Sequence, residues 1–161
     1  MGGRASLGAT WKAIASTAVV DARDNTDTNP LSATYPIFLL NGTKLVDAGY
    51  DLWDGSIATP FNITQHGTIV PPDPGGVAAG VWTGTLFDGT RATGPGLGTL
   101  GDPSAVAGVA VHTTGAWVHS IPWATDNLRR LYAMSTFLTV PEPTTCTLAL
   151  LGLFLMSKRR F

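Results

Sequence analysis

Apolar and β-branched residues recur along most of the chain in short runs that turn residues separate. Residues 35–40 and 43–46 are two such runs, and between them stands Asn41-Gly42, a dipeptide typical of a type I′ hairpin turn. These runs therefore predict a β-hairpin. A looser alternation of apolar and polar positions over residues 10–20 predicts one or two further strands.

Later runs continue this pattern. Residues 81–85 predict a strand leading to a turn at Asp88-Gly89, and residues 116–119 and 130–135 predict closing strands. A turn held by a buried Trp53 is expected over residues 51–57. Polar or Gly/Pro-rich composition predicts loops over 21–30, 70–80 and 94–101.

Composition supports a fold with many loops and little helix. The 161 residues include 19 Gly and 11 Pro, and Thr and aromatic residues suit strands and turns better than long helices. Only 13% of residues are charged and the net charge is −1. The chain therefore lacks the excess of basic residues that a nucleic-acid-binding protein needs. The single cysteine, Cys146, allows no internal disulfide. We expect one α+β domain, mainly β and loop-rich.

The C-terminal tail has three physical parts. Pro141, Glu142 and Pro143 enforce an extended stretch, because proline restricts its own backbone and that of its predecessor. An uncharged run follows, with the apolar residues Cys146, Leu148, Leu150, Leu151, Leu153, Phe154 and Leu155. The basic residues Lys158, Arg159 and Arg160 then favour the cytoplasmic side of a membrane.

The length of the apolar run suits a temporary membrane anchor. As a helix, residues 146–156 would span ~16 Å, against a hydrocarbon core of ~30 Å. A segment that inserts but holds poorly is better suited to later removal than to permanent anchoring. The alternative, a buried terminal helix, would need a polar face that this run lacks.

This order of Pro-Glu-Pro, apolar run and basic end resembles the PEP-CTERM sorting signal. The resemblance covers residues 140–161 and implies a short transmembrane sorting helix that an exosortase, a membrane-embedded peptidase, recognises through Pro141-Glu142-Pro143. It implies an exported protein that is held transiently in the inner membrane and then delivered to the cell surface or extracellular matrix. Residues 1–139 would form the extracellular domain.

An exported protein needs an N-terminal signal peptide, and the first eleven residues contain no apolar stretch of that kind. A core strand is already expected near Trp11. We therefore expect that the natural product begins upstream of Met1 and that the extracellular domain is incomplete at its N-terminus.

Several motifs of the body resemble bacterial surface domains related to endostatin and the C-type-lectin-like fold. They are Trp11-Lys-Ala, Val20-Asp-Ala-Arg-Asp, Asp51-Leu-Trp-Asp-Gly, Val81-Trp-Thr-Gly-Thr and Arg130-Leu-Tyr. Their order over residues 7–135 implies a lectin-like binding domain without catalytic activity. The family commonly has a cysteine pair around the last motif. Here Ala133 occupies the later position and no cysteine precedes Arg130, so that disulfide is absent.

One loop carries carboxylates that suit calcium. Asp21, Asp24 and Asp27 recur every three residues, and Ca²⁺ prefers oxygen ligands. The loop lacks the alternate ligand positions, the glycine and the distal glutamate of an EF-hand, and Arg23 lies among the acids. A salt-bridged or solvated turn is the favoured alternative to a calcium site. The histidines His66, His112 and His119 have no spacing typical of zinc.

The body offers residues for two further chemistries. A secreted hydrolase would draw an acid–base pair from Asp51, Asp54, His66 or Asp88, and no nucleophile motif accompanies them. Aromatic residues offer either a sugar-stacking platform or a core, and the core is favoured; they are Trp53, Trp82, Trp117, Trp123, Tyr50 and Tyr132.

The sequence thus predicts an exported, non-catalytic surface protein that binds extracellular polysaccharide or another surface protein. A purely structural envelope component is the remaining alternative.

Overall fold

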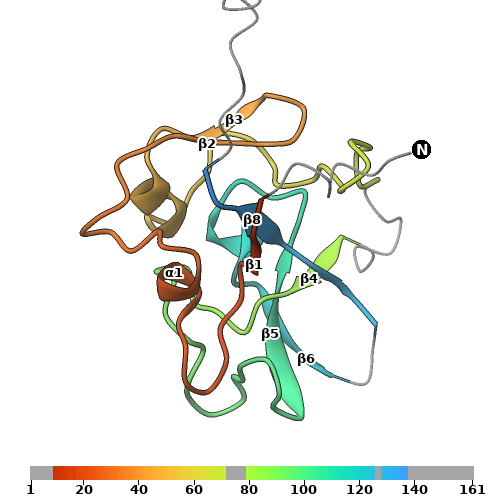
Figure 1. The fold of residues 1–161 in the computed structure, drawn as a ribbon. Helices are drawn as coiled ribbons and strands as arrows, with labels where there is room; N and C mark the ends of the chain where they lie inside the picture. Colours follow the sequence, from red (N-terminus) through yellow and green to blue (C-terminus); the bar gives the residue numbers. More distant parts are fainter. Residues whose placement is uncertain (1–8, 72–78, 126–127, 138–161) are drawn as a thin grey trace, which may run out of the picture.

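A computed structural model describes residues 9–71, 79–125 and 128–137 (Figure 1). Short strands and long loops dominate this part of the chain, and the only α-helix in it has four residues. The expected β-rich, loop-rich architecture is confirmed. In chain order the elements are β1 (Trp11–Ala13), α1 (Ala22–Asn25), β2 (Ile37–Phe38), β3 (Lys44–Val46), η2 (Gly49–Trp53), β4 (Gly80–Trp82), β5 (Ser104–Val109), η3 (Gly115–Trp117), β6 (Ile121–Ala124), β7 (Arg130–Leu131) and β8 (Ala133–Ser135).

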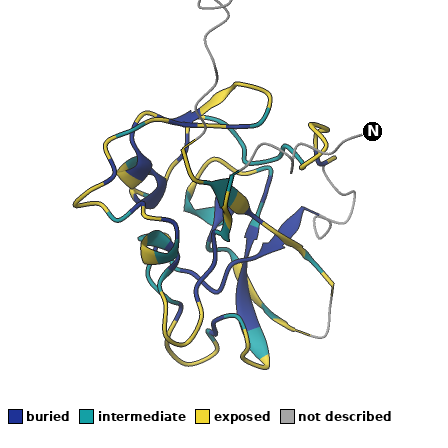
Figure 2. Cartoon of the chain, in the orientation of Figure 1, coloured by how far each residue is buried: buried dark blue, intermediate teal, exposed yellow. Residues whose placement is uncertain are grey.

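The largest sheet has four strands in the order β6-β5-β4-β7. Strand β5 is antiparallel to both β4 and β6, whereas β4 and β7 run parallel. All three residues of β4 are buried, so the strand is covered on both faces (Figure 2). A central position in the sheet explains why Val81-Trp82 carries no polar alternation.

Two smaller antiparallel pairs complete the β structure. Strand β1 pairs with β8, and Trp11 lies opposite Ser135. Strands β2 and β3 form the expected hairpin, with Ile37 opposite Val46 and a bulge before Phe38. The β1–β8 pair brings the first and last strands of the described chain together near the centre of the view in Figure 1.

The hairpin turn differs from the predicted type I′. That turn requires a positive φ at both central residues, but Gly42 has φ 85° and Asn41 has a negative φ. Gly42 N–H donates to Leu39 O at 2.9 Å, and Leu39 N–H donates to Thr43 O at 2.8 Å. This is a type I turn followed by a left-handed glycine, which closes a three-residue loop.

Three local predictions need correction. The loop expected over 21–30 contains α1, and residues 116–119, expected as a strand, overlap the 3-10 helix η3. Strands β5 and β6 were not predicted. In β5 the small residue Gly108 is required because a Cβ there would lie 1.9 Å from Trp117 O, so the strand passes directly against η3.

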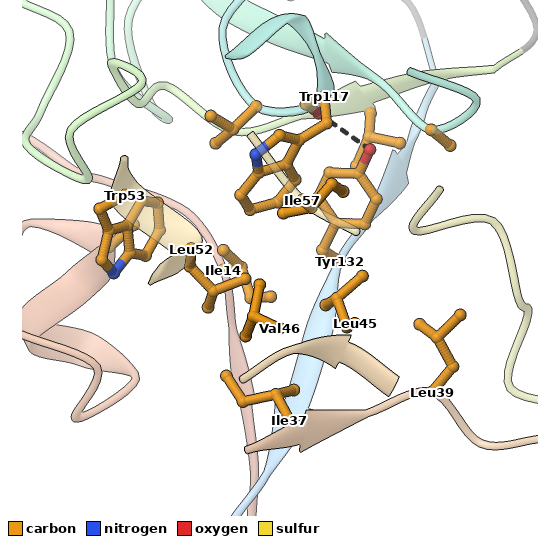
Figure 3. Close-up of a cluster of buried hydrophobic side chains, with 14 of the residues drawn as sticks. Ile14, Ile37, Leu39, Leu45, Val46, Leu52, Trp53, Ile57, Trp117 and Tyr132 are labelled. Atoms are coloured by element: carbon orange, nitrogen blue, oxygen red, sulfur yellow. Dashed lines mark hydrogen bonds between the residues drawn. The ribbon is translucent and has the colours of Figure 1, made fainter. Parts of the chain in front are cut away.

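One main hydrophobic cluster joins the pieces (Figure 3). Fully buried Ile14, Leu45, Leu52 and Trp117 come from four separate parts of the chain. Trp117 lies 5.5 Å from Tyr132 and 6.0 Å from Trp53, measured between ring centroids. Because the strands are short, packing around these aromatic rings, rather than long hydrogen-bonded ladders, holds the sheets together.

The predicted membrane segment lies outside the described residues, as do the sorting motif and the basic end. Within residues 9–71, 79–125 and 128–137 no helix is long and apolar enough to cross a membrane.

Candidate functional site

A cleft of about 1320 Å³ lies between the β2–β3 hairpin and the strands β1, β7 and β8. The loop over residues 61–70 forms another part of its wall. Its inner surface includes the buried residues Val81, Ala110 and Tyr132, which belong to the edge of the main core. The cleft is therefore continuous with the core.

Large apolar side chains are exposed around this cleft. Trp11 is 37% exposed, Phe38 55%, Leu131 54% and Phe137 74%. Each comes from a different segment, so the apolar character belongs to the cleft rather than to one strand. Side chains of this size are normally covered, and a gathering of them marks an interaction surface.

The polar side chains of the cleft are mostly bonded to one another. Lys12 Nζ forms an ion pair with Asp27 at 2.6 Å. Thr64 and Thr68 hydroxyls share a hydrogen bond of 2.7 Å across a tight turn. Gln65 Nε2 lies 3.3 Å from His66 Nε2. The walls thus present apolar surface between polar groups that already have partners.

One aromatic contact joins the two ends of the cleft wall. The rings of Tyr35 and Phe137 meet edge to face at 4.4 Å, and the Tyr35 hydroxyl donates to Asp27 O at 2.9 Å. The segment after β8 is thereby held against the segment before β2. Beneath it, burial raises the pKa of Tyr132, whose hydroxyl donates to Trp117 O at 2.9 Å. Tyr132 is a structural part of the core.

The three aspartates of the candidate calcium loop have separate partners. Asp21 accepts from Arg91 Nε at 3.1 Å, Asp24 accepts from Asn29 at 2.8 Å, and Asp27 pairs with Lys12. Among the described residues no group of three His, Cys, Asp or Glu side chains is placed to hold a metal. This geometry fits the salt-bridged turn rather than the calcium site.

The candidate hydrolase residues do not form an acid–base pair. Asp51 Oδ2 accepts from Ala48 N–H, Asp54 accepts from Ser56 N–H, and each therefore serves its own turn. His66 lies in the cleft wall beside Gln65. His112 is exposed and His119 half-buried, both near η3.

Asp88 closes another turn by accepting from the Thr90 hydroxyl at 2.6 Å and from its N–H at 3.0 Å. Partial burial opposes ionisation of this carboxyl. The hydrogen bonds from Thr90 and the charge of Arg23 outweigh it, and the pKa of Asp88 falls below its usual value. A general acid needs the opposite shift.

Most of the candidate sugar-stacking aromatics are core residues. Trp53, Trp82, Trp117 and Tyr132 are each at most 9% exposed. Tyr50 is exposed outside the cleft lining, and Trp123 stacks on the Arg129 guanidinium at 4.3 Å. These four residues therefore belong to the core rather than to a sugar-stacking platform.

The cleft residues Phe38, Leu131 and Phe137 were not singled out from the sequence, and Trp11 was expected in a core strand. No signal in the sequence distinguishes these residues from the buried apolar residues of the same runs. The sorting residues Pro141, Glu142 and Pro143 lie outside the described residues, as do the apolar run from Cys146 to Leu155 and the basic residues Lys158, Arg159 and Arg160.

Comparison of the chain with protein-family models, with curated proteins and with solved structures finds no significant match.

Proposed function

We propose that this protein is an exported bacterial surface protein, sorted by an exosortase, whose body is a non-catalytic, lectin-like binding domain. The tail carries the proposal. Pro141-Glu142-Pro143, the uncharged apolar run and the terminal basic cluster stand in this order over residues 140–161. The extended stretch would be recognised by the exosortase, and the apolar run would insert temporarily into the membrane. The basic end would stay on the cytoplasmic side.

The body supports a binding role over a catalytic one. Its carboxylates Asp51 and Asp54 each serve their own turn, and the cleft beside β2 and β8 is lined mainly by apolar side chains. Clefts of this kind bind ligands by burying surface, with a few polar groups that fix orientation. The proposed ligand is extracellular polysaccharide or another surface protein, and the proposed site is the cleft beside β2 and β8.

The lectin-like assignment is the finer part of the proposal. It rests on the order of the body motifs, from Trp11-Lys-Ala to Arg130-Leu-Tyr, and on the loop-rich β architecture that accommodates them. Fold analogy alone names no ligand, so the ligand has to be identified by experiment.

Intact mass and cell fractionation of the natural protein, expressed from its own locus, test the sorting step. We expect a mature species at the cell surface or in the matrix that lacks the residues after the Pro-Glu-Pro motif. Replacing the motif, Pro141→Ala with Pro143→Ala, should leave the protein unprocessed and in the inner-membrane fraction, because the extended recognition stretch is lost.

Pro95→Ala, in an exposed loop of the body, is the matched control and should be processed normally. A cytosolic species that retains its complete tail would rule out the proposal. Surface material that binds neither a polysaccharide nor a protein would favour a structural envelope role instead.

A further inference from the structure

We infer that the cleft face lies against the outer surface of the inner membrane, in contact with phospholipid, for as long as the apolar tail holds the protein there. This face comprises the cleft and the exposed side chains Trp11, Phe38, Leu131 and Phe137 around it. The inference rests on the proposed function and deepens it, because the binding site then opens to an extracellular ligand only after the tail is removed.

The chain leaves the described part of the body at this face. Phe137, the last described residue, lines the cleft, and the apolar run begins nine residues later at Cys146. Even fully extended, a segment of this length spans at most about 30 Å. A membrane-inserted tail therefore keeps Phe137 and the cleft beside it close to the bilayer, with Pro141-Glu142-Pro143 between the two.

The exposed side chains of this face are of the kind that favours a membrane interface. Phe38, Leu131 and Phe137 are each more than half exposed, and Trp11 adds an indole ring at the rim. Aromatic and aliphatic side chains of membrane-associated proteins enter the layer between the headgroups and the acyl chains, where tryptophan is enriched. The four side chains would therefore be covered by phospholipid rather than left in water.

The charge of this face is compatible with anionic headgroups. Residues 1–139 contain ten acidic and seven basic side chains, so an anionic lipid surface repels the body as a whole. Asp27 is the only carboxylate that lines the cleft, and an ion pair with Lys12 neutralises it. The cleft face thus approaches such a surface without the repulsion that exposed carboxylates such as Asp54 and Asp102 would meet.

Contact with lipid also leaves the polar groups of the lining satisfied. The hydroxyls of Thr64 and Thr68 bond each other, and the Tyr35 hydroxyl donates to Asp27 O. Burying a polar group is costly only where it loses its hydrogen-bond partner, and these hydroxyls keep theirs. The lining can therefore be covered by lipid at little cost.

Fluorescence of the full chain in vesicles tests the inference. The chain carries Cys146→Ser, so that a single cysteine can be introduced elsewhere, and is anchored by its tail in vesicles of phosphatidylethanolamine and phosphatidylglycerol. A nitrobenzoxadiazole label is attached to Phe38→Cys or, as the matched control, to Phe87→Cys. Phe87 is 53% exposed but does not line the cleft.

We expect spin-labelled lipid to quench the label at position 38 about five-fold more strongly than the label at position 87, because only the cleft face reaches the headgroup layer. Leu131→Cys gives a second labelling position on the same face and should behave like position 38. Circular dichroism confirms that each labelled protein is folded. Equal quenching at positions 38 and 87, or no quenching at position 38 and position 131, would overturn the inference.

Other occupants of the cleft face give distinct results, and each would overturn the inference. Shielding of position 38 from water without lipid quenching, in a protein that sediments as a dimer, would assign the face to a second copy. The same shielding in a monomer, lost on Leu150→Asp with Leu153→Asp, would assign it to the protein's own tail. Failure of the proposed function appears separately, in cell fractionation, as a cytosolic protein with an intact tail.

Discussion

At the scale of single residues, much of this protein depends on polar side chains that hold turns together. Asp88 binds Thr90 in one loop, Asp54 binds Ser56 in another, and Asp102 accepts from both the N–H and the hydroxyl of Thr99. Such side chains replace backbone pairing where strands are too short to supply it. The acids that the sequence offered as catalytic candidates have this structural role.

Asp88 should therefore give the fold a measurable acid sensitivity. Its pKa is lowered in the folded state, so the ionised carboxylate stabilises the fold above the unfolded pKa of about 3.9. This contribution is lost as pH falls through the lower folded pKa. We expect Asp88→Asn to be less stable than the natural protein near neutral pH and the difference to narrow in acid.

Urea denaturation of both proteins over a pH series measures this difference. A gap that stays constant from neutral pH into strong acid would show that the Thr90 bonds and Arg23 do not stabilise the charge. Asparagine retains the acceptor oxygen, so the comparison isolates the charge from the turn geometry.

At the scale of elements, the sequence indicated turns through their characteristic residues, but it did not indicate strands that depend on tertiary contacts. Asn41-Gly42 located the hairpin correctly, because Gly42 requires a positive φ in either kind of turn. The exact turn depended on an additional loop residue, Leu40. Strand β5 escaped prediction because alanine, glycine and serine give it little β propensity, and its neighbours β4 and β6 alone make it a strand.

Gly108 should be the most sensitive position of β5. An added Cβ would meet Trp117 O at 1.9 Å, and backbone on both sides must then shift. We expect Gly108→Ala to lower the free energy of unfolding by about 3 kcal/mol or more, as overpacking does. Urea denaturation measures the effect.

Gly115→Ala is the control for this prediction. Its Cβ would lie 3.2 Å from Phe87 Cβ and no closer than 3.6 Å to Gly55, so a shift of a few tenths of an ångström at Phe87 relieves the contact. The cost there should be much smaller. Equal destabilisation by the two substitutions would contradict the tight approach of β5 to η3.

At the scale of the whole molecule, one aromatic and aliphatic cluster unites three small sheets. Leu45 from β3, Ile14 beside β1 and Val81 from β4 all belong to it. The burial of Trp53 was evident from the sequence, because a large aromatic among turn residues needs a core. The cleft was not evident, since Phe38 and Phe137 come together only through the folding of distant segments.

A shared core predicts that damage at one point affects the entire fold. Leu45 is fully buried, so Leu45→Ala should lower the free energy of unfolding by about 2–5 kcal/mol in a single cooperative transition. Leu31→Ala, at a residue that is 96% exposed, should change stability by less than about 0.5 kcal/mol. Separate transitions monitored by tryptophan fluorescence and by circular dichroism would contradict the common core.

The pairing of β1 with β8 has a topological consequence. Trp11 and Ser135 are direct partners in an antiparallel pair, so their Cα atoms lie about 5 Å apart. A short peptide linker can join these two points into a closed ring without moving either strand. The ring can then be reopened in the exposed loop at residues 94–96, which gives a circularly permuted protein. This protein keeps every strand pairing, and its two new ends lie in a loop that does not line the cleft.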